Sequence, residues 1–200
     1  RIERHLVEAR LPAGKTFDNF DFEAVPMISK AQVTALAAGD GWLGKGANLL
    51  LFGPPGGGKS HLAAAIGLAL IENGWRVLFT RTTDLVQKLQ VARRELNLEA
   101  AISRLDRFDL MILDDLAYVT KDQAETSVLF ELISARYERR SMLITANQGH
   151  ADKVRIVAEI ATSGDTVVLW LAAMDITVPF LRRLDQATRN RGGDRGGLFC

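Results

Sequence analysis

The chain has 200 residues, of which 48% are hydrophobic, and 25 Lys and Arg stand against 24 Asp and Glu. This length suits one sizeable domain, and a formal net charge of +1 excludes an overall field strong enough to attract nucleic acid or a membrane. A single cysteine, Cys200, excludes an internal disulfide and a cysteine metal site. The charged first residues resemble no signal peptide, and the apolar run 166–181 is too short to span a bilayer. We therefore expect a cytoplasmic protein without a membrane segment.

Residues 1–46 form a lead-in that precedes any regular alternation of strands and helices. Two helices are predicted there, at residues 2–11 and 29–38, and the aromatic loop "KTFDNFDFEAVP" (15–26) joins them. We expect this lead-in to be a helical extension of the domain that follows.

From residue 47 to residue 148, strands alternate with helices. Segments such as "ANLLLFG" (47–53) and "SMLITAN" (141–147) are apolar along almost their whole length, which is typical of strands buried on both faces. The other predicted strands are 75–80 and 108–114, and the predicted helices are 59–73, 83–96, 98–106 and 123–139. This order predicts an α/β fold in which a parallel sheet lies between two helical layers, a three-layer αβα sandwich.

Residues 149–200 follow the alternation with a weaker pattern. A helix at 151–161 and a strand at 166–171 are predicted, and the tail "RNRGGDRGGLFC" is expected to be disordered because it is rich in glycine and charge. We treat this stretch as a separate C-terminal segment.

The motif "GPPGGGKS" joins the first of these strands to a helix and matches the phosphate-binding loop G-x-x-x-x-G-K-[ST]. Glycines allow consecutive backbone N–H groups to surround phosphates, and the N-terminus of the following helix adds partial positive charge. We expect Lys59 to reach the β- and γ-phosphates of ATP and Ser60 to bind Mg²⁺. A simple turn rich in glycine and proline is the alternative. The predicted nucleotide-binding residues are Gly53, Pro54, Pro55, Gly56, Gly57, Gly58, Lys59, Ser60 and His61, although for His61 a structural role is favoured over a catalytic one.

Two acids, Asp114 and Asp115, end the strand "FDLMILD". In a parallel sheet, ligands bind at the carboxyl ends of strands, which is where the phosphate loop also lies. We expect Asp114 to hold Mg²⁺ and Asp115 to act as the general base toward water. Asn147 ends the strand "SMLITAN" and could bond the γ-phosphate or orient the water. The alternatives are a turn-capping role for Asp115 and a turn-forming role for Asn147.

Together, three stretches of the chain resemble the IstB family of ATP-binding helper proteins of insertion-sequence transposition. They are the lead-in "FDFEAVPMISKAQV", the stretch "LLLFGPPGGGKSHLAAAIGLALIENGWRVLFTRTTDLVQKLQ" and the stretch "FDLMILDDLAYVTKDQAETSVLFELISARYERRSMLITANQ". The family is akin to the DnaC helicase loaders among the AAA+ ATPases, and the resemblance covers about residues 1–148. It implies a five-stranded AAA+ core with Gly53 to Ser60 as Walker A, Asp114 and Asp115 as Walker B and Asn147 as sensor 1.

The resemblance also implies partners: double-stranded DNA, a transposase of the same insertion sequence and further copies of the chain in the ATP state. After Asn147 the chain reads "GHADKVRIVAEIATSGDTVVLWL" and departs from the family pattern, so that no residue is assigned as the arginine finger or the second sensor. Arg182 and Arg183 match no motif. A truncated, rearranged or frameshifted copy is one interpretation of this departure.

Basic residues gather on the predicted helices after the second strand. Lys88, Arg93 and Arg94 are candidates for contacts with DNA phosphates, which would be sequence-tolerant and salt-sensitive. A solvated amphipathic helix explains them equally well, since acids are interspersed. For the arginines of "SARYERRS" (134–141), interaction with the helix C-terminus is favoured over a subunit interface.

Four functions remain open from the sequence. The leading one is a DNA-assembled ATPase that assists a transposase, and a helicase loader is a close alternative. A small-molecule kinase also uses a phosphate loop, but the paired acids and Asn147 argue against it. The fourth is a remnant that binds ATP without hydrolysing it.

Overall fold

The computed structural model describes residues 1–116, 123–147 and 166–170. The predicted helix at 151–161 and the glycine-rich tail lie outside these residues. The helices are α1 (Ile2–Ala9), α2 (Lys30–Ala38), α3 (Lys59–Glu72), α4 (Thr82–Arg94), α5 (Leu98–Leu105) and α6 (Gln123–Arg136), with a 3-10 turn, η1 (Leu43–Lys45). The strands are β1 (Asn48–Gly53), β2 (Val77–Arg81), β3 (Leu110–Asp114), β4 (Ser141–Asn147) and β5 (Thr166–Trp170). In the described part of the chain, every helix falls short of the length and apolar character needed to cross a membrane.

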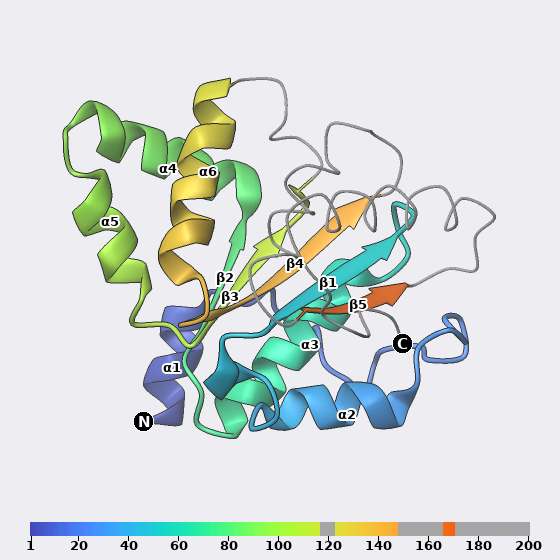
Figure 1. Ribbon diagram of the computed structural model, residues 1–200. Helices are drawn as coiled ribbons and strands as arrows, with labels where there is room; N and C mark the ends of the chain where they lie inside the picture. The colour runs from blue at the N-terminus through green and yellow to red at the C-terminus, as the bar shows by residue number, and fades with distance from the viewer. Residues whose placement is uncertain (117–122, 148–165, 171–200) are drawn as a thin grey trace, which may run out of the picture.

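The five strands form one sheet in the order β2-β3-β4-β1-β5, and all neighbouring strands are parallel. Figure 1 shows α1, α2 and α3 on one face of this sheet and α4, α5 and α6 on the other. The predicted three-layer αβα sandwich is therefore confirmed. Because all strands run the same way, the acids that end β3, the end of β4 and the loop after β1 meet at one edge.

Two hydrophobic cores fill the space between the layers, and the strands supply both. Leu49 and Leu51 of β1 face the core under α3, whereas Leu50 and Phe52 face the core under α4 and α6. This alternation follows from the two-residue period of a strand, and burial of both faces explains why the strands are apolar throughout. At Gly67 of α3, a Cβ would lie 2.8 Å from Ile112 of β3, so glycine lets the helix approach the sheet closely.

Three helices end earlier than their hydrophobic pattern predicts, because a residue after each one adopts a left-handed conformation. Arg10 follows α1 with φ 55°, Leu96 follows α4 with φ 55° and Glu138 follows α6 with φ 52°. A left-handed residue stops the helical hydrogen-bond pattern, and such caps usually carry glycine. None of these three residues is glycine or asparagine, so the sequence carries no sign of the caps and predicts the three helix ends too late.

Candidate nucleotide-binding site

The phosphate loop connects β1 to α3 through backbone conformations that favour glycine. Gly56 has φ 77° and Gly58 has φ 81°. A Cβ at Gly58 would lie 3.1 Å from the ring of Phe20, which comes from the aromatic loop of the lead-in. The loop thus needs glycine for its turn and, at Gly58, also for the close approach of Phe20. These conformations fit a loop whose backbone N–H groups surround phosphates.

Lys59 is 7% exposed and begins α3 at the base of the loop. Its Nζ donates hydrogen bonds to the carbonyl oxygens of Gly53 at 3.0 Å and Pro54 at 2.6 Å, so the side chain lies back along its own loop. Burial lowers the pKa of Lys59, while the nearby charges of Asp115 and Asp114 act in the opposite direction. The ammonium group is therefore bonded to the backbone of its own loop and is near enough to both acids for their charges to act on its pKa.

Ser60 and Asp114 are 54 residues apart in the sequence and lie in contact in the structure. The Ser60 hydroxyl donates a hydrogen bond of 2.7 Å to Asp114 Oδ1. Hydroxyl and carboxylate oxygens are ligands that suit Mg²⁺, which also takes phosphate oxygens and water. Among the described residues no three His, Cys, Asp or Glu side chains cluster as a metal site. The pair fits Mg²⁺ brought by a nucleotide.

Asn147 ends β4 and pairs in register with Gly53, the first residue of the phosphate loop. The parallel pairing places its half-buried side chain at the same edge of the sheet as the loop and the acids. The structure thus brings together the three predicted groups: the phosphate loop, the paired acids and Asn147. Their chemical roles stay predictions.

Two threonines that sequence reasoning missed bond to the acids. Thr145 of β4 donates to Asp114 Oδ1 at 2.7 Å and accepts from the Asp115 N–H at 2.9 Å, and Thr82 donates to the Asp114 carbonyl oxygen at 2.9 Å. Both are buried. A hydroxyl inside the otherwise apolar "MLITA" (142–146) was the available signal for Thr145, since a buried hydroxyl needs a partner. No pattern in the sequence distinguishes Thr82.

His61 connects α3 to the lead-in. Its Nε2 lies 2.9 Å from the Thr16 carbonyl oxygen and 2.8 Å from Asn19 Oδ1, and its ring meets the Phe20 ring edge-on with centroids 5.3 Å apart. Both oxygens accept, so Nε2 carries the proton. These contacts give His61 the structural role that was favoured, and its assignment as a nucleotide-binding residue stays a prediction.

The three candidate DNA contacts on α4 differ in their surroundings. Arg93 forms an ion pair with Glu131 and donates to Ser127 Oγ at 3.3 Å, so its side chain joins α4 to α6. Lys88 and Arg94 are exposed. Arg93 is thus engaged in helix packing, whereas Lys88 and Arg94 are accessible, and contacts of all three with DNA stay predictions.

The arginines at the end of α6 and just after it are engaged within the chain. Arg136 is fully buried and donates to the carbonyl oxygens of Leu105, Phe108 and Ser141. Burial is the main cause that lowers its pKa to about 10, and it stays charged at neutral pH. Arg139 Nε donates to the carbonyl oxygen of Ala135 in the last turn of α6 at 3.0 Å, as expected for a cation near a helix C-terminus.

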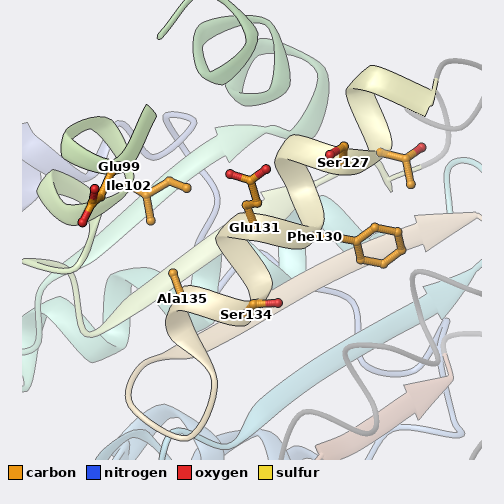
Figure 2. A pocket seen from close by; sticks show the side chains of 8 residues that line it. Glu99, Ile102, Ser127, Phe130, Glu131, Ser134 and Ala135 are labelled. Carbon is orange, nitrogen blue, oxygen red and sulfur yellow. The ribbon is translucent and has the colours of Figure 1, made fainter. Parts of the chain in front are cut away.

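A pocket of about 580 Å³ lies between α5 and α6 (Figure 2). Its lining residues are Glu99, Ile102, Thr126, Ser127, Phe130, Glu131, Ser134 and Ala135. Ser127 and Glu131 are the residues that Arg93 contacts. The pocket thus lies beside the contact between α4 and α6, and none of the predicted site residues lines it.

Residues 1–162 match the family described as IstB-like ATP binding protein. Of the relatives, a Sinorhizobium fredii protein named as an insertion sequence ATP-binding protein is 70% identical over 197 residues, which cover 96% of this chain and 66% of the relative. The insertion sequence IS21 ATP-binding protein of Pseudomonas aeruginosa is 39% identical over 151 residues, 76% of this chain and 57% of the relative. The chain thus spans about two thirds or less of these relatives.

These matches extend beyond the limit near residue 148 that the sequence predicted. The family match continues to residue 162, and an alignment that covers 96% of the chain must include most of residues 149–200. The C-terminal segment, or most of it, is therefore aligned with the Sinorhizobium fredii relative.

Solved structures show the same fold. The DnaC helicase loader aligns with a TM-score of 0.56 and 25% identity over 70% of this chain and 86% of that chain. AMPPCP-bound DnaA from Aquifex aeolicus aligns with a TM-score of 0.65 and 18% identity over 90% of this chain and 65% of that chain. The fold is that of AAA+ P-loop domains, and the chain belongs to the family of IstB-like ATP-binding proteins of insertion sequences.

Proposed function

We propose that this chain binds ATP with Mg²⁺, hydrolyses it, and assembles on double-stranded DNA to assist the transposase of its insertion sequence. The observation that carries the nucleotide site is the hydrogen bond between Ser60 and Asp114, which joins the phosphate loop to the first acid. A segment that matches the phosphate-loop motif can still be a simple turn. Here, however, the Ser60 hydroxyl at the end of the motif is bonded to the carboxylate of Asp114 at the end of β3, and these are the two protein groups that a nucleotide–Mg²⁺ site needs.

Each residue has a defined part in this proposal. The backbone N–H groups of Gly56 to Lys59 and the Lys59 ammonium group bind the phosphates, and Ser60 and Asp114 hold Mg²⁺. Mg²⁺ supplies neutralisation of the charge that develops on the phosphate oxygens. Asp115 accepts a proton from the attacking water, and Asn147 orients that water.

The proposed role in transposition is supported by family membership and by the names of the relatives, which are insertion sequence ATP-binding proteins. Contacts with DNA are supported by the exposed positions of Lys88 and Arg94 on α4. DnaA bound to single-stranded DNA is a structural neighbour at 17% identity. An identity this low supports a shared fold only, so DNA as a partner of this chain is part of the proposal.

A helicase-loading role is the second candidate, and the match to the DnaC helicase loader at 25% identity favours it. The relatives of higher identity are insertion sequence proteins, so transposition is preferred. The two roles differ in partner: co-purification with the transposase supports the first, and co-purification with a replicative helicase supports the second.

The nucleotide site is tested by the substitution Lys59→Ala. Loss of the ammonium group removes its charge-assisted bonds to phosphate, so ATP affinity should fall by about tenfold or more in an equilibrium titration with Mg²⁺. The matched control is Lys45→Ala, which removes an exposed lysine of η1 and should leave affinity unchanged. Equal affinity in both variants would remove the phosphate-loop assignment.

Turnover is tested by steady-state ATP hydrolysis with and without duplex DNA, with Lys59→Ala as the blank. DNA-stimulated hydrolysis is expected if neighbouring copies complete each other's sites on DNA. ATP binding without turnover under either condition would contradict the proposed ATPase and leave a nucleotide-binding protein.

A further inference from the structure

The peptide unit between Asp114 and Asp115 is bonded on both sides by threonine hydroxyls. Thr82 Oγ1 donates to the Asp114 carbonyl oxygen at 2.9 Å, and the Asp115 N–H donates to Thr145 Oγ1 at 2.9 Å. Thr82 directly follows β2, Thr145 lies on β4, and β3 lies between these two strands. The two threonines therefore reach one peptide unit from opposite sides. We name this pair, Thr82 and Thr145, the threonine clamp.

The proton of the Thr145 hydroxyl has a defined direction. A backbone N–H can only donate, so Thr145 Oγ1 accepts from Asp115, and its own proton goes to Asp114 Oδ1 at 2.7 Å. Thr145 is 1% exposed and Thr82 is fully buried. Buried hydroxyls are costly unless they are bonded, and each of these two directs its proton to an atom of Asp114.

Asp115 needs such support because its backbone is strained. Its φ is 56°, in the left-handed region that costs free energy for a residue other than glycine. The direction in which the Asp115 side chain leaves the backbone depends on this angle and on the orientation of the preceding peptide unit. Bonds that fix that peptide unit therefore also determine where the Asp115 carboxylate lies.

Asp114 Oδ1 links the clamp to the phosphate loop. This one oxygen accepts from Thr145 at 2.7 Å and from Ser60 at 2.7 Å. The bonds run without a break from Ser60 of the loop to Asp114, from Asp114 to Thr145, and from Thr145 to the Asp115 N–H. The clamp thus holds the first acid through its side chain and the second through its backbone.

We propose that the threonine clamp sets the position of the general base, so that Thr82 and Thr145 are positioning residues for hydrolysis. They act through the peptide unit and through Asp114, and they are not catalytic residues. This inference rests on the proposed ATPase function and adds Thr82 and Thr145 to the residues on which hydrolysis depends.

The kinetic test compares Thr145→Val with Thr145→Ser. Valine removes the hydroxyl and keeps the shape, so kcat should fall by about tenfold or more while KM for ATP stays within about threefold; serine restores the hydroxyl and should keep kcat within about threefold. Thr82→Val acts on the other side of the peptide unit and should also lower kcat. The matched control is Ser141→Ala, because Ser141 is buried on the same strand and its hydroxyl has no partner among the described residues. Its kcat should equal that of the wild type.

Wild-type kcat in folded Thr145→Val and Thr82→Val proteins would overturn the proposal, as would a Thr145→Ser enzyme as slow as Thr145→Val. A general loss of ATP binding in the Val variants would also overturn it, because positioning should spare binding.

A second measurement does not depend on turnover. Hydrogen exchange of the Asp115 amide should be slow in the wild type and in Thr145→Ser and faster in Thr145→Val. Equal exchange in the two variants would contradict the clamp. Absence of turnover in the wild type, in contrast, would reject the ATPase proposal alone.

Discussion

Asp115 combines a strained backbone with a carboxylate at the edge of the sheet. Its φ of 56° lies in a region that asparagine and aspartate tolerate better than most residues. Asp115→Asn therefore keeps the backbone conformation and removes only the basic carboxylate, whereas alanine would add strain to the loss of the base.

We expect Asp115→Asn to bind ATP with the affinity of the wild type and to hydrolyse it about a hundredfold more slowly, because a positioned general base contributes about this much or more. ATP titration and steady-state hydrolysis measure the two effects separately. An unchanged rate would remove Asp115 as the base and support its alternative role in the turn after β3.

At the scale of elements, α4 carries two adjacent arginines with different surroundings. Arg93 is bonded to Glu131 and Ser127 of α6, whereas Arg94 is exposed. Arg93 therefore contributes to the packing of α4 against α6, whereas Arg94 contributes positive charge to the surface.

Arg94→Ala should weaken binding to duplex DNA and lower the slope of log affinity against log salt by about 1, as the loss of one phosphate contact would. Arg93→Ala should change DNA affinity less and instead lower the midpoint of urea unfolding, since it loses a link between α4 and α6. Fluorescence anisotropy over a salt series checks the first effect. The opposite ranking of the two variants in DNA affinity would contradict this division of roles.

At the scale of the whole molecule, Arg136 and the nucleotide site lie at opposite ends of the sheet. Arg136 bonds the carbonyl oxygens of Leu105 and Phe108, which precede β3, and that of Ser141, which begins β4. The phosphate loop and the acids lie where the strands end. A buried cation thus stabilises one end of the sheet while the other end carries the proposed chemistry.

Arg136→Met should lower the free energy of unfolding by about 3 kcal/mol, because three carbonyl oxygens lose a charged donor. Arg136→Lys should lose less, since it keeps the charge but not the planar fork. Chemical denaturation measures both. ATP affinity of the folded Arg136→Met protein should equal that of the wild type, and a large loss of affinity would show that the two ends of the sheet are coupled.

The sequence predicted most of the fold because the signals are local and strong. Apolar strands such as 47–53 and the helices between them have clear patterns, and all five predicted strands are present. The predicted helix ends were less accurate, because Leu96 and Glu138 adopt left-handed conformations that are uncommon for leucine and glutamate. Such conformations depend on packing around the turn.

By itself, the sequence determined the parallel αβα architecture and the residues of the proposed site: the phosphate loop, the paired acids and Asn147. The motif spacing and the rule that parallel strands end at one edge were sufficient for this. Only the tertiary structure decided which side chains meet: that Thr82 and Thr145 bond the acids, that Arg93 pairs with Glu131, and that Arg136 is buried. The physical reason is that a hydroxyl or a guanidinium group has the same chemistry in every context, and its partner is set by contacts between segments far apart in the chain.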